Sequence, residues 1–239
     1  MLIHQESIKA VHIRYGIALM ISLQIILLTV SYSVSVSLKK MKYPYLYLSA
    51  SIDKDPVRSL ACVLGPIIAI LSGFVLLMRS VLLRPFIVTT SQLRLWRIFS
   101  ISSIVICFAL IAVPAIPHSL NAWLHMTAAF LLFSSGLLIV LSSFWLDITL
   151  ALPTSRLLLK LRLVCLCLTI LGAIGFAVCY FFIPLLSSIF EILAAASMNT
   201  YICTFAYTCD VIPANKHNIQ NSFSDLISKA CTEEVSVGP

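Results

Sequence analysis

The fold is decided by residues 122–146, AWLHMTAAFLLFSSGLLIVLSSFWL, because this stretch contains no Asp, Glu, Lys or Arg. An α-helix needs about 20 apolar residues to cross a hydrocarbon core about 30 Å thick. Five further stretches meet this requirement: 16–38, 59–83, 98–117, 163–183 and 185–207. The sequence therefore predicts an all-α, polytopic membrane helix bundle with six transmembrane helices.

The composition agrees with a membrane protein. Hydrophobic residues make up 60% of the chain, charged residues 10%, and the mean hydropathy is +1.04. A soluble domain has roughly 45–50% apolar and 25% charged residues, so a soluble protein could not cover its surface with so few charges. The net charge of +7 is better explained by basic loops beside membrane spans than by nucleic-acid binding, and we expect no nucleic-acid partner.

The boundaries between spans rest on prolines and charges. Pro184 alone separates the fifth and sixth segments, and its neighbours are apolar. Residues 16–38 are longer than a signal-peptide core of about 7–15 residues, so we expect a span there; cleavage near its serine-rich end is the alternative. We expect residues 1–209 to form the transmembrane domain and residues 210–239 to form a disordered cytoplasmic tail, because the tail is polar and lacks periodicity.

The distribution of Lys and Arg predicts the orientation. With the N-terminus inside, eleven basic residues lie inside: Lys9, Arg14, Arg79, Arg84, Arg94, Arg97, Arg156, Lys160, Arg162, Lys216 and Lys229. Five lie outside, all in one loop: Lys39, Lys40, Lys42, Lys54 and Arg58. Because basic residues favour cytoplasmic loops, we expect both termini in the cytoplasm.

No catalytic or metal-binding motif is present. The sequence contains no nucleotide-binding glycine loop, nucleophile elbow or paired carboxylate motif. Its eight cysteines show no C-x-x-C or Cys/His zinc spacing. We therefore expect a protein that is not an enzyme, with no cofactor, no metal ion and no catalytic residues.

Two ionisable residues fall at membrane depth, where they usually face a partner or a water-filled cavity. His125 lies roughly 6 Å and Glu191 roughly 9 Å past the luminal start of their helices, at 1.5 Å per residue. We predict that they share a luminal polar site with the loop residues Ser49, Asp53 and Asp55. The alternative is a wetted, idle histidine at the helix end.

Two other charged residues near the inner ends of helices are interpreted differently. For Arg79 and Asp147 we favour a topology-setting or solvated role, and neither is placed in the predicted site. Small residues in the fifth and sixth segments, among them Gly172, Gly175 and Ala194, are of the kind that lets membrane helices approach closely, and we interpret them as close packing.

Several short motifs occur in a characteristic order. They are Tyr47-Leu48-Ser49 with Pro56, Leu124-His125-Met126-Thr127-Ala128-Ala129-Phe130, Ile189-Phe190-Glu191, Thr204-Phe205, and Asp210. From the first span to the sixth, this order resembles the damage-regulated autophagy modulator (DRAM) family. That family is part of the Frag/DRAM/Sfk superfamily, which also contains Frag proteins of GPI-anchor lipid remodelling and Sfk proteins of phosphoinositide regulation.

The resemblance implies a non-enzymatic membrane protein that regulates autophagy or membrane lipid handling in the endomembrane system. It implies a lysosomal, endosomal or Golgi membrane, with the plasma membrane as an alternative, and partners among membrane lipids and other membrane proteins. The alternative is a Frag-like protein of GPI-anchor lipid remodelling or a lipid transporter. Frag proteins carry an Asn and a downstream His where this chain has residues 198–202, MNTYI. The missing His disfavours the Frag branch. In the alternative interpretation, Asn199 corresponds to the Asn of Frag proteins at a shifted position.

Overall fold

The computed structural model describes residues 2–38, 51–53, 55–150, 154–180 and 182–208. The regular secondary structure of these residues consists of helices, joined by turns and short irregular stretches: α1 (Leu2–Ser37), α3 (Val57–Leu83), η1 (Arg84–Phe86), α4 (Thr90–Ala115), α5 (Ala122–Thr149), α6 (Arg156–Cys179), α7 (Pro184–Cys203) and η2 (Thr204–Tyr207). Within these residues, six helices are long and apolar enough to cross a membrane, so the predicted fold class is confirmed. Ser49 and the predicted tail lie outside the described residues.

Capping residues extend two helices beyond the predicted spans. Thr89 and Gln92 form a capping box at the start of α4: the Gln92 amide N–H donates to Thr89 Oγ1, and the Thr89 amide N–H donates to Gln92 Oε1. Ser155 caps α6, where Oγ accepts the N–H of Leu158. The basic residues between 90 and 97 and between 156 and 162 are therefore helical, whereas the hydropathy pattern alone placed them in loops.

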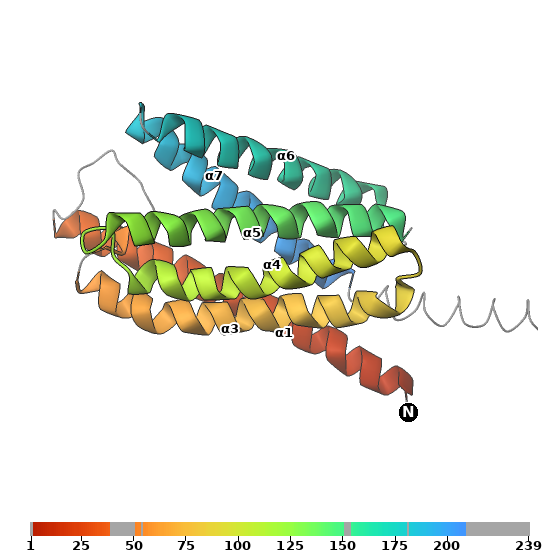
Figure 1. The fold of residues 1–239 in the computed structure, drawn as a ribbon. Coiled ribbons are helices and arrows are strands. Elements are labelled where there is room, and N and C mark those ends of the chain that lie inside the picture. The colour runs from red at the N-terminus through yellow and green to blue at the C-terminus, as the bar shows by residue number, and fades with distance from the viewer. Residues whose placement is uncertain (1, 39–50, 54, 151–153, 181, 209–239) are drawn as a thin grey trace, which may run out of the picture.

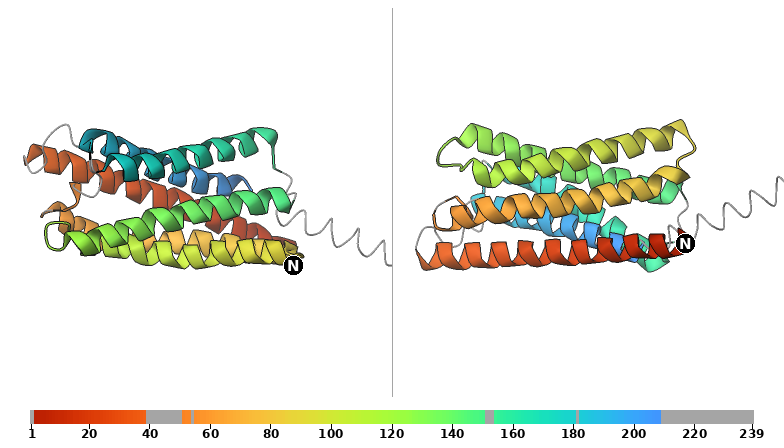
Figure 2. Two further views of the ribbon diagram at one scale, coloured as in Figure 1. Left: turned by 45° about the horizontal axis from the view of Figure 1, so that its top comes forward. Right: turned by 90° about the horizontal axis from the view of Figure 1, so that it is seen from below.

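The helices run side by side along one axis (Figure 1). α1, α3, α4 and α5 pack in series, each against the next, while α6 and α7 form a pair that contacts the rest mainly through α5 and α1. The start of α1 lies at the same end of the bundle as η2, the end of α5 and the start of α6 (Figures 1 and 2). We call this the N-terminal end and the other the opposite end.

The α6–α7 pair packs closely at glycines. A Cβ atom added to Gly172 would lie 2.7 Å from the backbone nitrogen of Ala194, and one added to Gly175 would lie 2.5 Å from the Phe190 ring. These distances leave no room for a side chain, so the predicted close packing at the small residues is confirmed, and the structure shows that α6 and α7 are each other's partners there.

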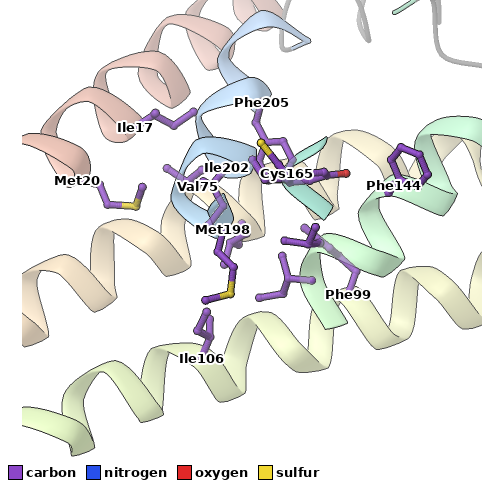
Figure 3. Close-up of a cluster of buried hydrophobic side chains, with 14 of the residues drawn as sticks. Ile17, Met20, Val75, Phe99, Ile106, Phe144, Cys165, Met198, Ile202 and Phe205 are labelled. Atoms are coloured by element: carbon purple, nitrogen blue, oxygen red, sulfur yellow. The ribbon is translucent and has the colours of Figure 1, made fainter. Parts of the chain in front are cut away.

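The apolar core lies where the helix pair meets the other four helices. Figure 3 shows Met20 of α1, Phe99 of α4, Cys165 of α6 and Met198 of α7 converging on one cluster. Large apolar side chains also cover the outside of the bundle, among them Val63, Phe108 and Phe130. A soluble protein rarely exposes so continuous an apolar surface, whereas a lipid-facing one requires it.

Candidate functional site

A cavity of about 200 Å³ lies inside the bundle, lined by residues of α1, α3, α4, α5 and α7. Its walls are mostly aliphatic and aromatic, and its four polar lining residues are Gln24, Ser72, Glu191 and Asn199. None of the described residues that line it is a Lys, Arg or His. Pockets of this kind, apolar with a few polar groups, are typical of sites for small apolar ligands.

The polar lining residues lie at different depths. Glu191 follows Pro184 by two helical turns and is thus nearer the opposite end, with 5% of its surface exposed. Gln24 lies near the middle of the membrane-crossing part of α1, Ile13–Ser37. Asn199 is two turns past Glu191 on the same side of α7. The cavity therefore offers polar groups along its length instead of at one mouth.

The other predicted site residues gather at the opposite end. His125 is buried in the first turn of α5, where its Nδ1 lies 2.7 Å from the Ile116 carbonyl oxygen and its ring meets His118 edge-on. Asp53 accepts the backbone N–H of Ser119 at 3.2 Å. These two predicted residues thus contact the same connection between α4 and α5.

Of the two remaining members of the predicted site, one lies at the start of α3, at the same opposite end, and the other cannot be placed. Asp55 accepts a hydrogen bond from the hydroxyl of Ser59 at 2.7 Å, and Ser49 lies outside the described residues. Glu191 lines the cavity, whereas His125 does not. The proposed coupling between His125 and Glu191 stays a prediction.

A second polar centre, missed by the sequence interpretation, lies at the N-terminal end. Asp147 of α5 accepts from Arg79 of α3 through Oδ1 and from Arg162 of α6 through Oδ2, both at 2.6 Å. The exposed fractions of Arg79, Asp147 and Arg162 are 2%, 3% and 0%. The solvated role favoured for Arg79 and Asp147 is therefore wrong, because the two residues pair with each other and with Arg162 inside the bundle; a topology-setting role stays a prediction. We call these three residues the ion cluster.

The segment that follows α7 completes the ion cluster. Thr204 Oγ1 accepts from Arg162 Nε at 2.8 Å, and Thr208 Oγ1 accepts from Arg79 Nη1 at 3.1 Å. The Arg79 guanidinium stacks on the Phe205 ring at 3.9 Å. Four elements, α3, α5, α6 and η2, are therefore joined through one buried network. The ion cluster carries two positive charges against one negative, and the threonines and the aromatic ring stabilise the excess.

The signal for the ion cluster was present in the sequence but ambiguous. Asp147 directly follows the uncharged run 122–146, and Arg79 is the one charged residue of the predicted span 59–83. Either residue could have been at the membrane surface, because hydropathy places helix ends to within a turn only. Arg162 was assigned to a loop, so no pairing with it was considered.

Comparison with known proteins adds one result. The family model described as Frag1/DRAM/Sfk1/Cwh43P N-terminal domain matches residues 12–208. Neither a curated protein nor a solved structure matches the chain significantly. The matched range covers all six spans and includes the cavity, the ion cluster and the threonines of η2. The chain therefore belongs to the Frag1/DRAM/Sfk1/Cwh43P family of multi-pass membrane proteins.

Proposed function

We propose that this protein handles membrane lipids by binding part of a lipid in the cavity between its helices. The observation that carries the proposal is the apolar cavity of about 200 Å³ at membrane depth. An engineered apolar cavity of about 150 Å³ binds benzene. The volume here thus suits a ring or a short chain segment of a lipid, with the rest of the molecule outside.

The proposed role is regulatory and not enzymatic. Within the described part of the chain, Glu191 is the only titratable side chain that lines the cavity, whereas covalent or acid–base catalysis usually needs a nucleophile and a base in mutual reach. Binding would let lipid content change the protein's shape or partners. The same proposal includes membership of the DRAM branch and a role in regulating autophagy or lipid handling. The protein would then be located in lysosomal, endosomal or Golgi membranes. Imaging a tagged copy against organelle markers tests the location.

Cavity filling tests the lipid-binding proposal. Purified protein in nanodiscs is labelled with photoactivatable lipids, and the parent is compared with Ala195→Phe, whose new ring would occupy the cavity, and with the milder Ala195→Leu. Ala196 is the matched control, because it is the next residue on α7, is exposed, and does not line the cavity.

We expect both Ala195 variants to lose most of the labelling on cavity residues, with the larger loss for phenylalanine, while Ala196→Phe keeps it. Labelled positions are read by peptide mass spectrometry. The proposal fails if the parent shows no labelling of cavity residues, or if the Ala195 and Ala196 variants label alike.

A second candidate function is lipid movement or remodelling, including that of GPI anchors. It is favoured by Glu191 and Asn199, which place a carboxyl and an amide on the cavity wall at membrane depth. Liposomes containing the protein would then exchange fluorescent phospholipid or GPI lipid between leaflets faster than empty liposomes. Equal exchange rates in the two preparations would exclude transport.

A further inference from the structure

We infer that the lipid segment held in the cavity carries an uncharged hydroxyl or amide group, which hydrogen-bonds to the side-chain amides of Gln24 and Asn199. The inference rests on the proposed lipid binding and names the chemical class of the ligand. It excludes a phosphate or other anionic group from the cavity itself.

Among the described residues, the two amides are the polar lining groups for which the structure shows no hydrogen-bond partner. Neither the Gln24 nor the Asn199 side chain makes a hydrogen bond within the described part of the chain, and both are partly buried. By contrast, the Ser72 hydroxyl donates to the Ile68 carbonyl oxygen at 2.7 Å, and Glu191 already has an interaction partner. The hydrocarbon core contains no water to hydrogen-bond an amide, so such groups are costly there unless a ligand or a partner helix satisfies them.

Both amides lie at a similar depth. Measured from the N-terminal end, Gln24 is eleven residues past Ile13, or about 16 Å at the α-helical rise. Asn199 precedes Tyr207 by one α-helical turn and the η2 segment, or about 14 Å. In a hydrocarbon core about 30 Å thick, both are near the midplane. A single polar group on a lipid could thus meet α1 and α7 at one level.

Charge argues against an anionic ligand. Among the described residues, the cavity lining contains a carboxyl residue and no basic one, so a phosphate held by them would be desolvated without a counter-charge. The buried guanidinium groups of Arg79 and Arg162 already bind Asp147 and the threonines around it. A hydroxyl or an amide instead offers both donor and acceptor, which is what a primary amide complements.

Sterols, diacylglycerols and ceramides all carry such a group, and the competing ligand is a phospholipid that inserts only an acyl chain. A chain would fill the same volume but make no use of the amides. Binding of a lipid with a hydroxyl or amide group should therefore depend on Gln24 and Asn199, whereas binding of an acyl chain should not. Binding of either ligand should depend on the free volume beside Ala195.

The experiment uses the full-length protein in phosphatidylcholine nanodiscs with four photoactivatable probes: a sterol, a diacylglycerol, a ceramide and a phosphatidylcholine. Gln24→Leu and Asn199→Leu remove the amides and keep similar side-chain volume, and Gln24→Asn and Asn199→Gln retain them. Thr200→Leu is the matched control, because Thr200 is the next residue after Asn199 and is exposed.

We expect at least one uncharged probe to label the cavity, and each leucine variant to lower that labelling about fivefold, as for the loss of one neutral hydrogen bond. The amide-retaining variants should recover part of the labelling, and Thr200→Leu should match the parent. Which of the three uncharged probes responds identifies the source of the hydroxyl or amide.

A measurement on the parent protein alone guards against variants that fail to fold. Excess unlabelled lipid of the responding class should displace its probe, and excess phosphatidylcholine should not. The inference is overturned if phosphatidylcholine competes equally, or if folded leucine variants label like the parent; lipid binding would then stand with a different ligand class. If no probe labels the cavity of the parent, the proposed function itself fails.

Discussion

Asp147 is the residue on which the N-terminal end of the bundle depends. Its carboxylate is the acceptor shared by Arg79 and Arg162, and all three side chains are withdrawn from solvent. Removing one partner of a buried ion pair typically costs about 3–5 kcal/mol, because the remaining charge stays buried without compensation. Removing one arginine should cost less stability than removing the aspartate, because the ion cluster contains one more positive charge than negative.

This asymmetry predicts an order of stabilities. Asp147→Asn leaves two arginines facing each other and should lower the free energy of unfolding by about 3–5 kcal/mol. Arg162→Gln leaves a neutral Arg79–Asp147 pair and should cost less. Arg156→Gln, on the same helix but exposed, should stay within about 0.5 kcal/mol of the parent.

Thermal unfolding in detergent, followed by tryptophan fluorescence, checks this order. If Arg162→Gln destabilised the protein as much as Asp147→Asn, the idea that one positive charge of the ion cluster is in excess would be contradicted. If all three variants unfolded with the parent, the ion cluster would contribute nothing to stability.

Three residues, Glu191, Gln24 and Asp147, show how far residue-scale reasoning from the sequence reaches. Glu191 was singled out because a carboxyl at membrane depth is unusual, and it lines the cavity. Gln24 was not noticed, because an uncharged amide hardly disturbs the hydropathy of a span. Asp147 was noticed and misinterpreted, because the sequence does not show whether a helix end is at the surface or inside the bundle.

At the scale of elements, α6 and α7 behave as one unit. Their contact runs through Gly172 and Gly175, where backbone or ring atoms of α7 occupy the space of a Cβ. The pair meets the rest of the bundle at the ion cluster and along the cavity. The spacing of these helices therefore also sets the position of the α7 residues that line the cavity.

A larger side chain at the contact should separate the two helices. Gly172→Leu must displace the backbone of Ala194, and we expect a loss of about 1–3 kcal/mol in the free energy of unfolding, as for overpacked cores. Ala177→Leu is the control, because Ala177 is exposed on the same helix. Stability measured by unfolding in mixed detergent micelles should fall for the first variant only, and equal stability of the two would show that the contact is not tight in the membrane.

At the scale of the whole molecule, charge is distributed unevenly between the two ends. Exposed basic residues at the N-terminal end are Arg14, Arg84, Arg94, Arg97, Arg156 and Lys160, whereas Arg58 is the basic residue at the opposite end within the described part of the chain. Because basic residues favour the cytoplasmic side, we propose that the N-terminal end faces the cytoplasm.

Epitope accessibility tests this orientation. Tags before Met1 and after Pro239 should be reached by antibody after selective permeabilisation of the plasma membrane. A tag inserted after His118, in the connection at the opposite end, should require permeabilisation of internal membranes, or be reached from outside if the protein is at the cell surface. The reverse pattern would invert the bundle and contradict the charge argument.

The sequence by itself determined the number of helices and the fold class, because a lipid core about 30 Å thick demands runs of about 20 apolar residues and leaves the backbone no alternative to the helix. Hydropathy alone did not locate the helix starts, which are set by capping residues such as Thr89 and Ser155. Only the tertiary structure decided which side chains meet. Arg79 and Asp147 are 68 positions apart in sequence, and Gln24 and Asn199 come from the first and last spans. Whether such residues pair, as Arg79 and Asp147 do, or line one cavity, as Gln24 and Asn199 do, depends on the rotation and neighbours of each helix. Packing against other helices sets both, and hydropathy does not encode them.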